Sequence, residues 1–170
     1  MNGVFIDSSV FLNFLEGKEK AKTLLEEYSG LEGCINDIVF SEVLFVYIKA
    51  ETEKKSYELK KQPELVKSVE LSDIMELLGR YRTLDIGEAV KSGTEGLIKK
   101  YGLLPNDALI AATCKHYGIK KIATFDPDFK RVDFLRLLQR NNLSKLFRFF
   151  RIALLFLFLF WCLTSLLLKR

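Results

Sequence analysis

Short apolar segments alternating with helical ones constrain the fold of this chain most strongly. Strands are expected at residues 3–6, 32–36, 82–86 and 120–125, with a last strand around Val132–Leu135. The longer segments between them have apolar residues at helical spacing. This alternation predicts an α/β fold with a mostly parallel sheet. Ligands of such sheets bind at the carboxyl ends of the strands, where the strand order reverses.

The helical segments carry their own start and stop signals. Glycines are expected to break the first segment near Gly17 and close it at Gly30, and Pro63 should start a new element. The expected helical segments are residues 8–30, 37–51, the charged stretch 51–80, 87–102 with two internal glycines, and an almost wholly apolar helix that begins near Leu103.

Composition bounds the class of protein. A length of 170 residues allows one domain with a proper core, and a hydrophobic content of 49% argues against disorder. Six of the 26 basic residues and no acid follow position 139, so residues 1–139 hold 20 basic residues against 22 acids, a net charge of −2. Any case for nucleic-acid binding therefore rests on local patches. Three widely spaced cysteines fit a reduced cytosolic chain.

Four acidic residues lie near the ends of the expected strands. Asp7 directly follows the first strand, and Asp126 lies just past the fourth. Asp107 lies in the first turn of the helix that precedes the fourth strand, and Glu42 lies early in the helix after the second. All four side chains are therefore able to face the same edge of the sheet.

Each acid also has an ordinary explanation. Asp107 would complement a helix dipole, Asp126 would form a turn, Asp7 would cap a helix, and Glu42 would face water. Taken together, four converging carboxylates repel one another unless a cation lies between them. Oxygen-only ligands suit Mg²⁺ or Mn²⁺, so the set favours a metal site.

The segments that carry these acids resemble a known family. They are VFIDSSVFLNFLEG, FSEVLFVY and LPNDALIAATCKHYGIKKIATFDPDF, and their order resembles a PIN domain of the VapC-type ribonuclease toxin group over residues 1–138. The resemblance implies a three-layer sandwich around a five-stranded parallel sheet in the order 3-2-1-4-5. It also implies a Mg²⁺- or Mn²⁺-dependent endoribonuclease that pairs with a small antitoxin and often forms homodimers.

The resemblance also implies roles for single residues. The catalytic, metal-binding acids map onto Asp7, Glu42, Asp107 and Asp126, and the auxiliary residues onto Ser8, Asn106, which would help position Asp107, and Asp128. A bound cation would polarise the phosphoryl oxygen and activate a water for hydrolysis. Asp7 and Asp107 are the expected direct ligands, and Glu42 and Asp126 would bind a second ion or hold metal-bound waters.

An RNA substrate needs cations near the site. The candidates, interleaved with Tyr47 and Tyr57, are Lys49, Lys54, Lys55, Lys60 and Lys61. Basic and aromatic residues together suit single-stranded RNA, although such a mixture is also typical of a solvated helix face. The only histidine, His116, is expected to be a packed or surface residue, so no histidine mechanism is available.

Other functions fit the residues less well. A phosphatase of the haloacid dehalogenase type needs a second Asp where this chain has Ser9. A response-regulator receiver would use Asp85 and leave Glu42 and Asp107 without a role. The rival from another class is a catalytically idle PIN domain that binds RNA or protein, and intact acids at all four positions argue against it.

The resemblance stops before the C-terminal tail. A basic linker at 139–151 precedes 17 uncharged residues, Ile152 to Leu168, which as a helix would span about 25 Å against about 30 Å of hydrocarbon. More basic residues flank its domain side than its far side, which favours a cytoplasmic domain anchored in the cell membrane by this helix. The alternatives are an oligomerisation arm and a spurious extension of the reading frame.

Overall fold

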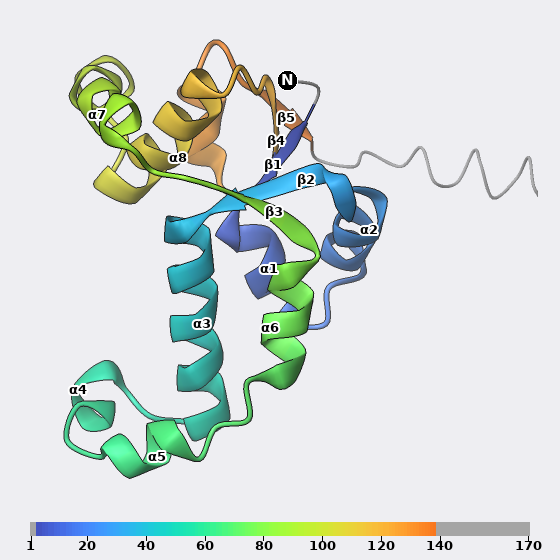
Figure 1. Ribbon diagram of the computed structural model, residues 1–170, viewed down its shortest axis with the longest axis vertical. Coiled ribbons are helices and arrows are strands. Elements are labelled where there is room, and N and C mark those ends of the chain that lie inside the picture. Colours follow the sequence, from blue (N-terminus) through green and yellow to red (C-terminus); the bar gives the residue numbers. More distant parts are fainter. Residues whose placement is uncertain (1–2, 139–170) are drawn as a thin grey trace, which may run out of the picture. The chain divides into compact units, whose positions relative to one another are not determined.

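A computed structural model describes residues 3–138 of the chain, and its strands form one parallel sheet (Figure 1). The order is β3-β2-β1-β4-β5, as the family resemblance implied. The strands are β1 (Val4–Ile6), β2 (Gly30–Asn36), β3 (Tyr81–Leu84), β4 (Lys121–Ala123) and β5 (Arg136–Leu138).

The central strand β1 sets the position of the site. Its residues Val4, Phe5 and Ile6 are all buried, as expected for a parallel strand that is covered on both faces. From β1 the chain builds β2 and β3 on one side, and β4 and β5 on the other. The strand order therefore reverses between β1 and β4, where Ile6 pairs with Ala123.

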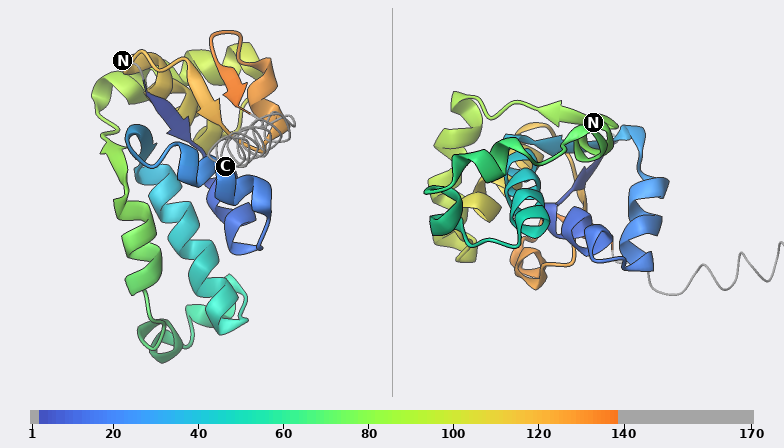
Figure 2. Two further views of the ribbon diagram at one scale, coloured as in Figure 1. Left: turned by 90° about the vertical axis from the view of Figure 1, so that its right-hand side faces the viewer. Right: turned by 90° about the horizontal axis from the view of Figure 1, so that it is seen from below.

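Helices from the strand connections cover both faces of the sheet (Figures 1 and 2). They are α1 (Ser8–Leu15), α2 (Glu19–Glu27), α3 (Asp37–Thr52), α4 (Ser56–Leu59), α5 (Pro63–Lys67), α6 (Ser72–Gly79), α7 (Glu88–Tyr101), α8 (Pro105–His116) and the 3-10 helix η1 (Pro127–Arg131). Right-handed crossovers place the helices that connect β1, β2 and β3 on one face, and α7 and α8 on the other. Helices α3 and α6 extend side by side away from the sheet, and α4 and α5 join their far ends.

Beyond shifts of one or two residues at other ends, two boundaries differ from the sequence-based prediction. Gly30 does not close a helix; with a φ of 84° it opens β2, because glycine adopts this left-handed conformation without strain. The last strand is not Val132–Leu135 but Arg136–Leu138, which pairs with β4. Val132 and Leu135 are buried in the turn after η1, so their apolar character reflects core contacts and not strand pairing.

Within residues 3–138, every helix is too short or too polar to cross a bilayer. The basic linker at 139–151 and the apolar segment at 152–168 lie outside the described residues.

Candidate active site

Asp7 lies at the junction of β1 and α1, and a network of hydroxyl groups holds it. The side chain is 3% exposed and caps α1. Its Oδ2 accepts hydrogen bonds from Ser9 Oγ at 2.5 Å and Thr124 Oγ1 at 2.7 Å. No side chain or backbone group of the described residues donates to Oδ1. One oxygen of Asp7 is thus fixed by the protein while the other remains available to a ligand.

Ser9, in the first turn of α1, also ties that helix to the segment after β4, where Thr124 makes a local contact. Ser9 Oγ accepts from the backbone N–H of Phe125 at 2.9 Å, and Thr124 Oγ1 accepts from that of Asp126 at 2.9 Å. Sequence reasoning did not assign either residue to the site. The available signal was their position, since Ser9 lies two residues after one acid and Thr124 two residues before another.

Glu42 projects from α3 and receives a donor on each oxygen. Ser8 Oγ donates to Oε2 at 2.7 Å, and Asn106 Nδ2 donates to Oε1 at 2.7 Å. Asn106 was expected to position Asp107, its neighbour in α8, but its amide reaches Glu42 instead. Consecutive residues of a helix point about 100° apart, so the side chains of Asn106 and Asp107 point in different directions.

The buried Asn36 explains why α3 lies beside α8. Its Oδ1 accepts from the backbone N–H of Val39 at 3.2 Å and so caps α3. Its amide donates to Thr113 Oγ1 of α8 at 3.0 Å. This double contact fixes the start of α3 against α8, which brings Glu42 within reach of Asn106.

Asp107 lies half-buried in the first turn of α8, close to several other acids. Within the described range, no hydrogen-bond donor reaches its carboxylate. Burial raises its pKa to about 6, with further contributions from four carboxylates, those of Asp126, Asp7, Glu42 and Asp128. The pKa of Asp7 is likewise raised by burial, opposed by the hydrogen bonds from Ser9 and Thr124. The predicted acids therefore act on one another electrostatically, and Asp107 is their common neighbour.

Asp126 and Asp128 have local partners in addition. Asp126 Oδ1 accepts from the backbone N–H of Asp128 at 2.8 Å and caps η1. Asp128 forms an ion pair with Arg131 at 2.6 Å. Asp126 thus has the turn-forming role considered from the sequence. The second carboxylate oxygen of Asp126 receives no hydrogen bond from residues 3–138.

The donor chemistry of the site fits a hard divalent cation. Asp7 and Asp107 each offer carboxylate oxygen without a competing donor, in surroundings that disfavour their negative charge. As the side chains stand, no group of three Asp, Glu, His or Cys residues within 3–138 is arranged to hold a metal ion. Mg²⁺ usually takes one or two protein carboxylates and keeps several waters, so two ligands suffice for this fit.

Comparison with known proteins identifies the family. Residues 4–135 match the PIN domain. The chain belongs to the PIN domain family. Ribonuclease VapC2 of Methanocaldococcus jannaschii is 49% identical over 140 residues, which cover 81% of this chain and 94% of that protein. Ribonuclease VapC6 of the same organism is 41% identical over 149 residues, covering 81% and 97%.

A solved structure agrees with the fold. The structure of a toxin-antitoxin complex from Klebsiella pneumoniae matches with a TM-score of 0.57 and 18% identity. The match covers 79% of this chain and 96% of that one. At this identity the likeness supports the PIN fold alone.

Four of the five lysines predicted to bind RNA lie beyond the far end of α3 from the acids of this PIN domain, and Lys49 lies about two helical turns from Glu42. Lys49 is in the last turns of α3, and Lys54, Lys55, Lys60 and Lys61 surround α4 at the far end of α3 (Figure 1). From Glu42 to the end of α3 the helix rises about 15 Å. These lysines therefore do not belong to the carboxylate cluster, and their contact with RNA stays a prediction.

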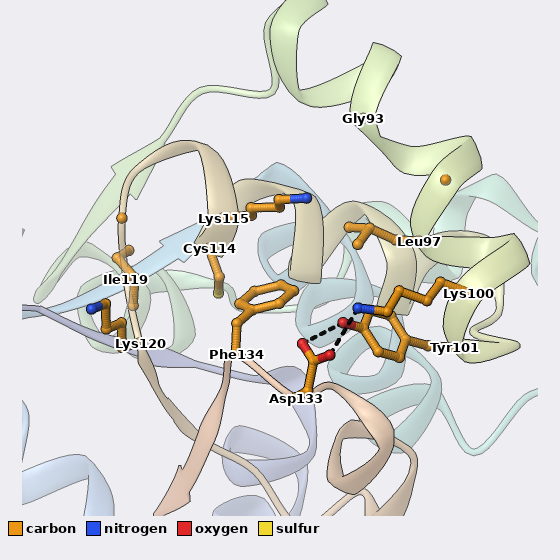
Figure 3. Close-up of a pocket in the computed structure, with 12 residues that line it drawn as sticks. Gly93, Leu97, Lys100, Tyr101, Cys114, Lys115, Ile119, Lys120, Asp133 and Phe134 are labelled. Carbon is orange, nitrogen blue, oxygen red and sulfur yellow. Dashed lines mark hydrogen bonds and ion pairs between the residues drawn. The ribbon is translucent and has the colours of Figure 1, made fainter.

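A cavity of about 520 Å³ lies between α7, α8 and the turn before β5 (Figure 3). Phe134 lines it, and Asp133 beside it accepts hydrogen bonds from Lys100 at 2.8 Å and Tyr101 at 2.5 Å. None of the four predicted site acids lines this cavity, so the cavity is separate from the candidate active site of this PIN domain.

Proposed function

We propose that this PIN domain is a Mg²⁺- or Mn²⁺-dependent endoribonuclease that hydrolyses RNA phosphodiesters and is the toxin of a toxin–antitoxin pair. The proposal rests on two carboxylates that offer oxygen without a hydrogen-bond donor, through Oδ1 of Asp7 and both oxygens of Asp107, and on the burial and neighbouring acids that raise the pKa of Asp107 to about 6. Two relatives with 49% and 41% identity are named ribonucleases, which supports the same activity here.

The chain's own residues suit metal-assisted hydrolysis. Asp7 and Asp107 would hold the cation, which supplies polarisation of the phosphoryl oxygen and a bound water of lowered pKa. Ser9 and Thr124 fix Asp7 so that it needs no rearrangement on binding. Glu42 is oriented by its two donors, and its remaining lone pairs accept hydrogens from water near the phosphate.

Asp126 would complete this arrangement from the β4 side. Its Oδ1 is occupied by the backbone of η1, so its other oxygen is the one that would hold a metal-bound water or a second ion. Asp128, paired with Arg131, would act as an auxiliary acid. Direct metal contact is thus assigned to Asp107 and to the donor-free Oδ1 of the buried Asp7, and indirect contact or a second ion to the other acids.

The inferred partner is an antitoxin whose apolar helix packs on α1 and α6. Two adjoining hollows of about 270 and 350 Å³ share Phe14, Leu77 and Arg80, and Leu15 beside them is 40% exposed. An amphipathic helix fits such a groove. We further infer a homodimer in the cytoplasm, where the free buried thiols of Cys34 and Cys114 would stay reduced.

One assay tests the activity. Purified protein is incubated with RNA in Mg²⁺ or Mn²⁺, and again after addition of a chelator, beside the Asp107→Asn variant. Cutting that requires the metal and is lost in the variant is expected. The proposal fails if the intact protein cuts no RNA, or if chelation leaves the cutting unchanged. RNA binding without cutting would favour the alternative, an idle binding module.

A further inference from the structure

We propose that Phe45, together with Lys49, forms a stacking platform for a base of single-stranded RNA beside the carboxylate cluster. This inference rests on the proposed ribonuclease function and names a substrate contact for it. Phe45 was not among the residues predicted from the sequence to contact RNA.

Phe45 lies on the same side of α3 as Glu42 and Lys49. Glu42, Phe45 and Lys49 are three and four residues apart, so they lie along one stripe of the helix. Phe45 is one turn beyond Glu42, a rise of about 4.5 Å. Glu42 is tied to Ser8 and Asn106, so this stripe begins at the acids and leads directly away from them.

Phe45 is unusually exposed for an aromatic residue of this helix. Its side chain is 48% exposed, although neighbouring apolar residues of α3, such as Val39 and Val43, are fully buried. Leu104, which is 68% exposed, lies two residues before Asn106, whose amide donates to Glu42. Large exposed apolar residues thus follow Glu42 by three positions and precede its partner Asn106 by two. A ligand with apolar faces would bury them, and a nucleobase next to the scissile phosphate has such faces.

The positive charge of Lys49 beside Phe45 favours an anionic ligand such as RNA. Lys49 Nζ lies over the ring, 5.5 Å from its centroid. Carboxylates alone would repel RNA, and this cation provides a phosphate contact next to an aromatic surface. Binding of single-stranded nucleic acid combines these two elements, cations along the backbone and aromatic rings under the bases.

The two tyrosines considered from the sequence are placed less favourably. Tyr47 donates its hydroxyl to the carbonyl oxygen of Glu70 at 3.3 Å, which turns it toward the segment before α6. Tyr57 is exposed but belongs to α4, at the far end of α3 from the acids (Figure 1). Among these aromatic residues Phe45 alone adjoins the site.

The test measures binding without cutting. The full chain carrying Asp107→Asn is titrated with labelled single-stranded RNA in Mg²⁺, and the dissociation constant is compared with that of the same chain carrying Phe45→Leu. Loss of one stacked base is expected to weaken binding about 5- to 150-fold. Met75→Leu on α6 is the matched control, because Met75 is also a large, 43% exposed apolar residue, and it should leave the constant unchanged.

A second measurement assigns the contact to a base. An abasic nucleotide is moved along the RNA, and one position should weaken binding to the parent while having no further effect on the Phe45→Leu chain. Phe45→Trp should retain binding and show fluorescence quenching by RNA. If Phe45→Leu leaves binding and kcat/KM unchanged while the parent enzyme cuts RNA, the stacking proposal is wrong and the ribonuclease proposal stands. If the variant instead changes the oligomeric state in sedimentation, the stripe is a contact between copies of the chain, and the proposal is overturned.

Discussion

Replacement of Asp107 by Asn should inactivate the protein and yet stabilise its metal-free fold. The carboxylate of Asp107 is half-buried, has no hydrogen-bond donor within residues 3–138, and lies near four other acids, which together with burial raise its pKa from 3.8 to about 6. A raised carboxyl pKa means that the folded state binds the proton more tightly than the unfolded state. The charged form therefore opposes folding above pH 6, and this penalty fades as the pH falls toward 4.

The size of the effect follows from the same values. A change from 3.8 to about 6 corresponds to at most about 3 kcal/mol. Because the side chain is half-exposed, solvent screening reduces this to about 1 kcal/mol. The neutral, isosteric Asn removes the penalty and keeps the helix start. We therefore expect Asp107→Asn to raise the free energy of unfolding by about 1 kcal/mol at pH 7.5 in EDTA, and to have little effect at pH 4.5.

Urea denaturation of both proteins at these two pH values measures the difference. If Asp107 serves only to complement the dipole of α8, the variant should instead lose about 0.3–1 kcal/mol at pH 7.5. A less stable variant would therefore refute the reasoning. Addition of Mg²⁺ gives a second readout, since ligand at 100 times its dissociation constant stabilises the wild type by about 2.7 kcal/mol, and the variant should gain less.

Three further predictions concern other parts of the chain. Asn106→Ala should lower kcat for RNA cleavage about 10- to 100-fold, because Glu42 loses a hydrogen-bond donor. Because Asn106 is exposed, the same change should alter the protein's free energy of unfolding by less than about 0.5 kcal/mol. Thr124→Val should cost about 1–3 kcal/mol in urea denaturation, because the buried Asp7 loses a donor and the backbone N–H of Asp126 its acceptor; an unchanged midpoint would contradict this. If the segment 152–168 is a membrane anchor, the full chain should stay in host membranes through high-salt and carbonate washes, and its recovery in the soluble fraction would exclude the anchor.

Much of the fold could be predicted because it follows from local patterns. The apolar segment Val4–Ile6 and the acid that follows it have the same meaning in sequence and in structure. The last strand could not be located in this way, because Val132 and Leu135 are apolar for a reason of tertiary packing. An apolar residue indicates burial, but its partner is decided only when the chain folds back.

The site shows the same division. The acids could be predicted from their positions after strands and at a helix start. The hydroxyls that hold Asp7 could not, because the contact of Thr124 with Asp7 spans 117 positions and depends on the pairing of Ile6 with Ala123. Similarly, the partner of Asn106 depends on the angle between α3 and α8, which Asn36 and Thr113 set together.

The wide spacing of the site along the chain has a consequence for its synthesis. Asp7 is translated early, directly after β1. Thr124, which holds Asp7, and Asp126 are translated much later, because they follow β4, the second neighbour of β1 in the sheet. At 5–20 residues per second, roughly 6 to 24 seconds separate the translation of Asp7 from that of Asp126. A nascent chain thus carries its first acid without the residues that complete the site. The proposed activity would therefore arise only after nearly the whole domain has been made, and a partner that binds α1 would have time to bind before then.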